Sequence, residues 1–155
     1  MSLRIVVVNP KGGSGKTTIA SNLLSAYARA GRRAALIDRD RQGSATRWLR
    51  QRPASLPPIH GIAAYEEPPA NVTRTFAMMV PPETERIVVD TAAALSRHEL
   101  VDAVRNADKI LVPVLPSDID IHAATRCIGD LLVHAKVPRG EAKLGVIANR
   151  VKRNT

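Results

Sequence analysis

The segment that most constrains the fold of this chain is a glycine-rich stretch near its N-terminus, Lys11-Gly12-Gly13-Ser14-Gly15-Lys16-Thr17-Thr18. A short apolar and β-branched run, residues 3–9, precedes it, and apolar residues at helical spacing follow it. Glycines allow backbone N–H groups to turn inward around an anion, and the N-terminus of the following helix adds positive potential at the same place. The order of strand, turn and helix therefore predicts a phosphate-binding loop.

The side chains of this loop suit a nucleoside triphosphate with Mg²⁺. The common pattern is G-x-x-x-x-G-K-[ST]; the chain matches its end but has Pro10 where the first glycine belongs. Lys16 can neutralise the β- and γ-phosphates, the Thr17 hydroxyl can ligate Mg²⁺, and Thr18 can bond the α-phosphate. A second lysine, Lys11, precedes the glycines, and one triphosphate has little room for both ammonium groups. The alternative is a glycine-rich turn with incidental lysines.

Apolar runs and helical patterns alternate along the rest of the chain. Strands are predicted at 33–38, 85–90, 109–115 and 143–149, with a weaker one at 59–64. Helices are predicted at 44–52, weakly at 70–80, after a capping box at 96–99, and from Asp118 or Asp120 to about residue 135. Because the strands are continuously apolar, this alternation predicts an α/β fold with a doubly wound, mostly parallel sheet flanked by helices. Its 155 residues suit a single domain, 1–155.

Polar residues follow several of these strands. They are the glycine-rich loop after the first strand, then Asp38 and Asp40, Asp90 and Thr91, and Asn149 and Arg150. Because ligands bind beyond the carboxyl ends of parallel strands, we expect these four segments to meet at one crevice.

The net charge of +9 is concentrated in two segments. Residues 29–53 hold eight arginines against two aspartates, and residues 136–155 hold six basic residues against Glu141. Such clustering favours a polyanionic partner, nucleic acid or an acidic membrane surface, although a solvated basic face fits equally well. The single cysteine, Cys127, fits a reducing cytoplasm, and no run approaches the ~20 apolar residues of a membrane span.

Taken together, these segments resemble the ParA/MinD family of deviant Walker A P-loop ATPases over nearly the whole chain. The matching segments are the phosphate loop at 11–18, switch I at 38–45, Walker B and switch II at 88–93, the A-D-x-x-x-x-P-V-x-P-S motif at 107–117, and Asn149-Arg150. Asn9-Pro10 and residues 44–48 resemble the small ParF-like plasmid-partition branch. Arg41 replaces the usual proline of switch I. Relatives usually continue with further strands and helices, so we expect a domain that lacks the C-terminal elements.

The resemblance implies a Mg²⁺-dependent ATPase in which ATP brings two subunits face to face. Lys11 would reach the phosphates of the partner, and without nucleotide it would have no anion to satisfy it. Asp38 and Asp40 would hold the Mg²⁺ shell and position the attacking water, and Asp90 would hold Mg²⁺ through water. The alternative for Asp38 is a helix cap or turn residue.

Asn149 and Arg150 would read adenine, although Asn149 can also be a simple turn former. The expected catalytic residues are Lys11, Lys16, Asp38 and Asp40, and the expected metal ligands are Thr17, Asp38 and Asp90. The expected nucleotide ligands are Lys11, Gly12, Gly13, Ser14, Gly15, Lys16, Thr17, Thr18, Asn149 and Arg150.

The function implied is that of a cytoplasmic partition ATPase, associated with the nucleoid when ATP-bound. It would bind DNA without sequence preference and hydrolyse ATP slowly under stimulation by a ParB-like or cargo-adaptor protein. The cargo would be a plasmid, a chromosome region or a protein assembly. Two alternatives stay open. A MinD-like membrane-surface switch needs a C-terminal amphipathic helix, and none is visible before Thr155. A metallocluster-carrier or other metabolic P-loop ATPase is the second, but a carrier needs paired cysteines.

Overall fold

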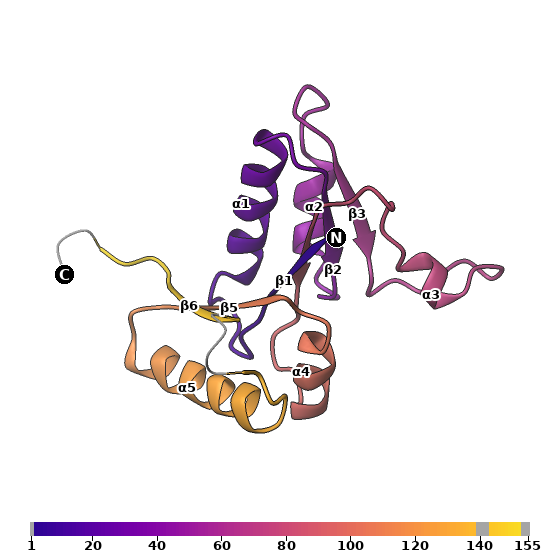
Figure 1. Cartoon of the computed structure of the whole chain (residues 1–155). Coiled ribbons are helices and arrows are strands. Elements are labelled where there is room, and N and C mark those ends of the chain that lie inside the picture. Colours follow the sequence, from indigo (N-terminus) through magenta and orange to yellow (C-terminus); the bar gives the residue numbers. More distant parts are fainter. Residues whose placement is uncertain (1, 139–142, 153–155) are drawn as a thin grey trace.

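The computed structural model describes residues 2–138 and 143–152, and a twisted parallel β-sheet forms its centre (Figure 1). The strands are β1 (Leu3–Val7), β2 (Ala34–Asp38), β3 (Ile59–Ala63), β4 (Arg86–Asp90), β5 (Lys109–Val114) and β6 (Leu144–Ala148). The helices are α1 (Lys16–Arg29), α2 (Ser44–Arg50), α3 (Arg74–Ala77), α4 (Arg97–Val104) and α5 (Asp118–Val133). The six strands lie in the order β3-β2-β4-β1-β5-β6, and every pairing is parallel.

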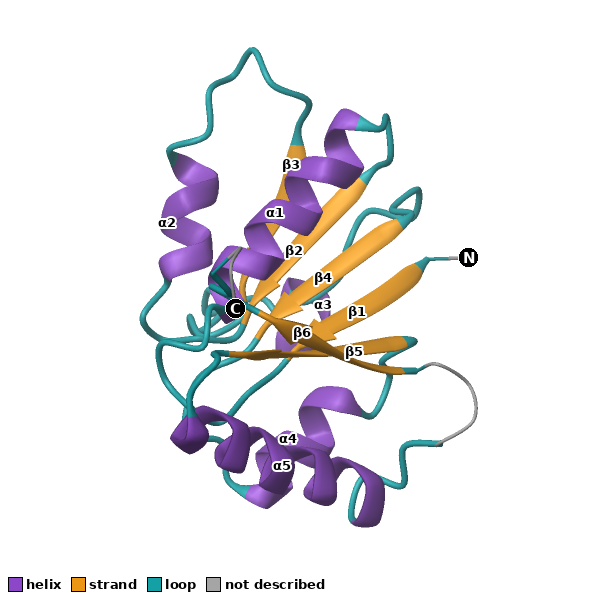
Figure 2. Cartoon of the chain, turned by 90° about the vertical axis from the view of Figure 1, so that its left-hand side faces the viewer, coloured by secondary structure: helices purple, strands orange, loops and turns teal. Residues whose placement is uncertain are grey.

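Helices cover both faces of the sheet, with α1 and α2 on one side and α4 and α5 on the other (Figure 2). Alternate residues of β1 face opposite layers: Val7 packs with Leu24 of α1, and Val6 belongs to the cluster that contains Leu131 of α5. The doubly wound α/β fold predicted from the alternating pattern is therefore confirmed. Aliphatic residues and alanine make up most of both clusters, as expected for a chain that is only 3% aromatic.

The sheet register aligns the strand ends that the sequence marked as polar. Val7 at the end of β1 pairs with Asp90 at the end of β4, and Asp38 at the end of β2 also pairs with Asp90. β1 lies between β4 and β5, so the loop that follows it leaves from the middle of the sheet. Two aspartates and the glycine-rich loop are thereby placed at one edge.

The starts of α2, α4 and α5 agree with the sequence-based expectations, and the structure adds which residues cap them. The capping box of Ser96 and Glu99 is present at α4. Helix α2 has Gly43 as its N-cap, at φ 61°, because a left-handed turn there lets the chain leave switch I. Helix α5 begins at Asp118, one of the two predicted starts, and is capped by Ser117, whose hydroxyl accepts a hydrogen bond from the Asp120 N–H. The weak helix expected at 70–80 is the single turn α3.

Candidate functional site

The glycine-rich loop is anchored from below by Asn9. This side chain is fully buried; its Nδ2 donates to the Pro113 carbonyl at 2.8 Å, and its Oδ1 accepts from the Lys11 N–H at 2.9 Å. Gly13 and Gly15 have φ of 77° and 95°, where a side chain would be strained. Gly15 is the N-cap of α1, so the helix begins at Lys16 with its free N–H groups facing the loop. The loop has the form that the sequence predicts for a phosphate cradle.

Lys16 lies folded into this loop. Its Nζ donates to the Lys11 carbonyl at 3.2 Å, and the residue is only 7% exposed. Burial lowers the pKa of Lys16, while the charges of Asp90 and Asp40 oppose that shift. An ammonium held against the loop backbone is positioned to meet an incoming phosphate.

Thr17 and Asp90 form a pair at the start of α1. The Thr17 hydroxyl donates to Asp90 Oδ2 at 2.7 Å, and Asp90 Oδ1 is buried without a hydrogen-bond partner among the described residues. Burial raises the pKa of Asp90 to about 6, against the hydrogen bond from Thr17. A hydroxyl and a carboxylate with one unsatisfied oxygen fit a Mg²⁺ ion, which prefers such oxygen ligands. If bound there, Mg²⁺ would neutralise phosphate charge.

Asp38 is fully buried, and both of its carboxylate oxygens accept hydrogen bonds. Oδ2 accepts from the N–H and the hydroxyl of Thr46, each at 2.8 Å, and Oδ1 accepts from the Asp40 N–H at 3.0 Å. Asp40 in turn accepts from the Gln42 N–H at 3.0 Å. These contacts are those of the turn-residue alternative, in which Asp38 ties switch I to α2. Its place in the Mg²⁺ shell, and the catalytic role of Asp40, stay predictions.

The expectation that Lys11 lacks an anion without nucleotide is wrong. Its Nζ lies 2.7 Å from Asp120 Oδ2, in the first turn of α5. The Ser117 hydroxyl donates to the same oxygen, and together these donors lower the pKa of Asp120. Sequence reasoning missed this partner because 109 residues separate the two side chains. The available signal was the strand-end rule: α5 follows β5, which neighbours β1.

Asn149 also reaches the phosphate loop. Its Nδ2 donates to the Ser14 carbonyl at 3.0 Å and lies against Gly15, where a Cβ would come within 2.1 Å of that nitrogen. Arg150 follows at φ 55° and is exposed. The structure thus brings Asn149 to the loop, as expected for two segments that follow strand ends, while adenine recognition by Asn149 and Arg150 stays a prediction.

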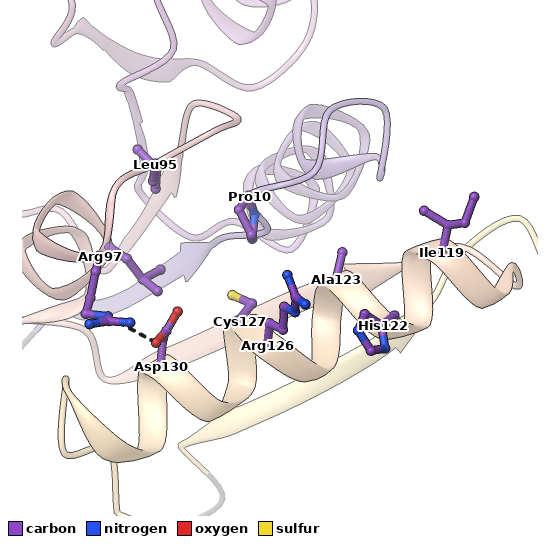
Figure 3. Close-up of a pocket in the computed structure, with 10 residues that line it drawn as sticks. Pro10, Leu95, Arg97, Ile119, His122, Ala123, Arg126, Cys127 and Asp130 are labelled. Carbon is purple, nitrogen blue, oxygen red and sulfur yellow. Dashed lines mark hydrogen bonds and ion pairs between the residues drawn. The ribbon is translucent and has the colours of Figure 1, made fainter.

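A cavity of about 430 Å³ lies beside this site, between α4, α5 and Pro10 (Figure 3). Apolar side chains line much of it, and the ion pair of Arg97 with Asp130, at 3.3 Å, closes one end. Cys127 contributes its thiol to the wall; it is 1% exposed, and burial raises its pKa to about 11. A neutral, buried thiol is a packing group.

A second cleft, of about 700 Å³, lies between switch I and α4 and carries charges of both signs. Arg39, Arg41 and Arg74 line it together with Glu99 and Asp102. Part of the basic C-terminal stretch, residues 139–142 and 153–155, lies outside the described residues. Within the described part of the chain, no helix is long and apolar enough to cross a membrane.

A glycine-rich phosphate loop after the central strand of a parallel sheet, with a threonine and a buried aspartate beside it, defines a P-loop nucleotide-binding protein. A sequence model described as the CobQ/CobB/MinD/ParA nucleotide binding domain matches residues 5–155. The chain therefore belongs to this family of nucleotide-binding domains.

The chain also resembles the following individual protein and solved structures, at low sequence identity. The chain is 28% identical over 152 residues to the maintenance of carboxysome distribution protein A of Halothiobacillus neapolitanus, covering 96% of this chain and 66% of that protein. The structure of the MinD cell division protein of Aquifex aeolicus has 27% identity and a TM-score of 0.69, with 97% and 70% coverage. The structure of pNOB8 ParA bound to nonspecific DNA has a TM-score of 0.72 with 99% and 71% coverage, but its 20% identity shows the fold alone. The chain thus spans about two thirds of the length of these proteins.

Proposed function

We propose that this chain carries the ATPase core of a partition-type positioning protein. It binds ATP with Mg²⁺, forms a face-to-face dimer, associates with DNA of any sequence and releases it after slow hydrolysis stimulated by a ParB-like or cargo-adaptor protein. The observation that carries this proposal is the cluster of Lys16, Thr17 and Asp90 around the glycine-rich loop, in a chain that belongs to the MinD/ParA family. The protein would act in the cytoplasm, on the nucleoid.

Within this mechanism, the residues of the site divide the work of phosphoryl transfer. Lys16 and the loop N–H groups would bind the phosphates, and Thr17, Asp38 and Asp90 would hold Mg²⁺, which supplies positive charge beside the phosphates when bound. Asp38 and Asp40, on the loop that begins at the end of β2, position the water. Lys11 serves the phosphates of the partner subunit, because Lys16 already occupies its own loop.

Three kinds of cargo fit the family, and the observations support them differently. The carboxysome-distribution protein of Halothiobacillus neapolitanus, similar over 96% of this chain, favours a protein assembly as cargo. Asn9-Pro10 and residues 44–48 favour the ParF-like branch and hence a plasmid. A chromosome region is the third kind of cargo.

A membrane-surface switch is a second candidate function. The likeness to the Aquifex aeolicus MinD structure supports it.

Size-exclusion chromatography with and without ATP and Mg²⁺ tests the proposed dimer. We expect ATP to shift the wild-type chain from monomer to dimer and Lys11→Ala to abolish that shift, because the variant lacks the cation for the partner's phosphates. Lys143→Ala is the matched control, since this residue precedes β6 at the opposite edge of the sheet. A wild-type chain that stays monomeric with ATP would contradict the proposal.

A further inference from the structure

We propose that Asp120 is a positioning residue that retains Lys11 within its own subunit, so that the Lys11–Asp120 ion pair sets how much ATP is needed for dimerisation. This role rests on the proposed function, in which Lys11 leaves its own subunit for the phosphates of the partner. The ion pair would then oppose dimerisation in the nucleotide-free chain, in addition to the lack of ATP.

The geometry gives Lys11 a definite place within its own subunit. Its Nζ is 2.7 Å from Asp120 Oδ2, a distance typical of a charge-assisted hydrogen bond. The lysine is anchored at its own backbone too, since its N–H donates to Asn9 Oδ1 at 2.9 Å. Its side chain is one third exposed, so the ammonium can leave without disturbing the core.

Asp120 depends on this ion pair more than Lys11 does. It is 4% exposed, the Ser117 hydroxyl donates to its Oδ2, and its Oδ1 has no hydrogen-bond partner within the described part of the chain. A buried carboxylate with so few donors depends on a nearby cation, because its desolvation is otherwise uncompensated. Without Lys11, the Asp120 carboxylate would keep only the hydrogen bond from the Ser117 hydroxyl and its place in the first turn of α5.

Two anions therefore compete for one ammonium. In the nucleotide-free subunit the anion is Asp120, and in the ATP-bound dimer it is the triphosphate of the partner. The dimer forms when the phosphates outweigh the aspartate, so weakening the intrasubunit pair should lower the ATP concentration at which dimers appear.

The test compares Asp120→Asn with Asp118→Asn, both in the first turn of α5. Asp118 is exposed, so its variant controls for the loss of one negative charge at the helix N-terminus. We expect Asp120→Asn to lower the ATP concentration for half-maximal dimerisation by about tenfold, which corresponds to about 1.4 kcal/mol. Asp118→Asn should leave it within about twofold of wild type. An unchanged or higher ATP requirement for Asp120→Asn overturns the proposal.

A second measurement reports on the ion pair without requiring a dimer. Acetylation of the nucleotide-free chain, followed by mass spectrometry, measures how readily each lysine amine reacts. We expect Lys11 to react several-fold faster in Asp120→Asn than in wild type and Asp118→Asn, with Lys143 as the internal reference. Asp120→Glu retains the charge and should restore most of the protection. Equal reactivity of Lys11 in all four proteins overturns the proposal.

The two measurements separate this inference from the function on which it rests. If ATP dimerises wild type in a Lys11-dependent way but Asp120→Asn has the same ATP requirement, only the role of Asp120 fails. If neither wild type nor Asp120→Asn dimerises at saturating ATP, the proposed function fails and the role of Asp120 falls with it. Circular dichroism of each variant, together with the Asp120→Glu result, distinguishes a lost ion pair from a misfolded chain.

Discussion

At the scale of single residues, two aspartates in register on neighbouring strands have opposite environments. Asp38 accepts three hydrogen bonds, whereas Asp90 accepts one from Thr17 and keeps a buried oxygen unsatisfied. The first is a structural anchor in the nucleotide-free chain. The unsatisfied, buried oxygen of Asp90 destabilises the folded chain, and a bound cation would remove that destabilisation. Such a residue is typical of a functional site.

Because the buried charge of Asp90 destabilises the folded chain, Asp90→Asn should increase the stability of the chain. Burial raises the folded-state pKa of Asp90 from 3.8 to about 6, so the folded chain binds this proton more tightly than the unfolded chain. The free energy of unfolding therefore falls as the pH rises between those two values, and the loss is complete above about pH 6. We expect Asp90→Asn to stabilise the nucleotide-free chain by about 3 kcal/mol at pH 7, with no such gain near pH 3.5, as measured by urea unfolding.

The same variant should lose the stabilisation that Mg²⁺ adds when ATP is present, because an amide is a poorer ligand. Asp38→Asn is the comparison for stability alone, because Asp38 is itself an expected Mg²⁺ ligand. It replaces an acceptor of three hydrogen bonds by a group that also donates, so it should destabilise the chain at neutral pH by about 1–3 kcal/mol. Destabilisation of Asp90→Asn at pH 7 would show that its carboxylate is structural.

At the scale of elements, the phosphate loop is held from three sides. Asn9 fixes its base, α1 begins at its end, and Asn149 after β6 holds the Ser14 carbonyl. The close approach of Asn149 to Gly15 also explains why that position lacks a side chain. The loop therefore depends on the last strand of the sheet as well as on the first.

Asn149→Ala tests whether this residue acts on the loop or on the base. Loss of its hydrogen bond to Ser14 should weaken nucleotide binding by roughly three- to tenfold, as expected for one neutral hydrogen bond. If Asn149 supports the loop, the affinities for ATP and GTP should fall by the same factor in titrations with fluorescent nucleotides. A selective loss of ATP affinity would instead show that Asn149 reads adenine, as the family resemblance implies.

The sequence predicted the elements better than their contacts. Apolar runs located the strands and the α/β class, because a parallel sheet covered on both faces needs continuous apolar segments. Thr17 and Asp90 could be predicted as neighbours, since both follow strand ends. The strand-end rule also brought the Asn149 segment to the loop, but it specified neither the hydrogen bond of Asn149 to Ser14 nor the pairing of Lys11 with Asp120. They depend on how crossovers order β1, β5 and β6, which no local pattern specifies.

At the scale of the whole molecule, the net charge of +9 gives the DNA proposal its physical basis. We expect random duplex DNA to be retained on filters only with ATP, and the affinity to fall about 100-fold between roughly 50 and 200 mM salt, as for four or so neutralised phosphates. Lys11→Ala should lose this binding if the dimer is the binding form. No retention at low salt would contradict the DNA part of the proposal.

Sedimentation with anionic liposomes is the parallel experiment for the membrane-surface alternative. ATP-dependent co-sedimentation in the absence of DNA retention would favour a MinD-like switch. DNA retention without co-sedimentation would favour the partition-type protein.

The position of β1 in the sheet has a consequence for synthesis on the ribosome. The glycine-rich loop is made before the segments on which it depends: the strand that carries it pairs with β4 and β5, and the loop contacts Asn149. The loop must therefore wait for these later segments, and it makes all of these contacts only when Asn149 is free of the exit tunnel. A nascent chain would thus acquire its full affinity for nucleotide only after β6 has been made.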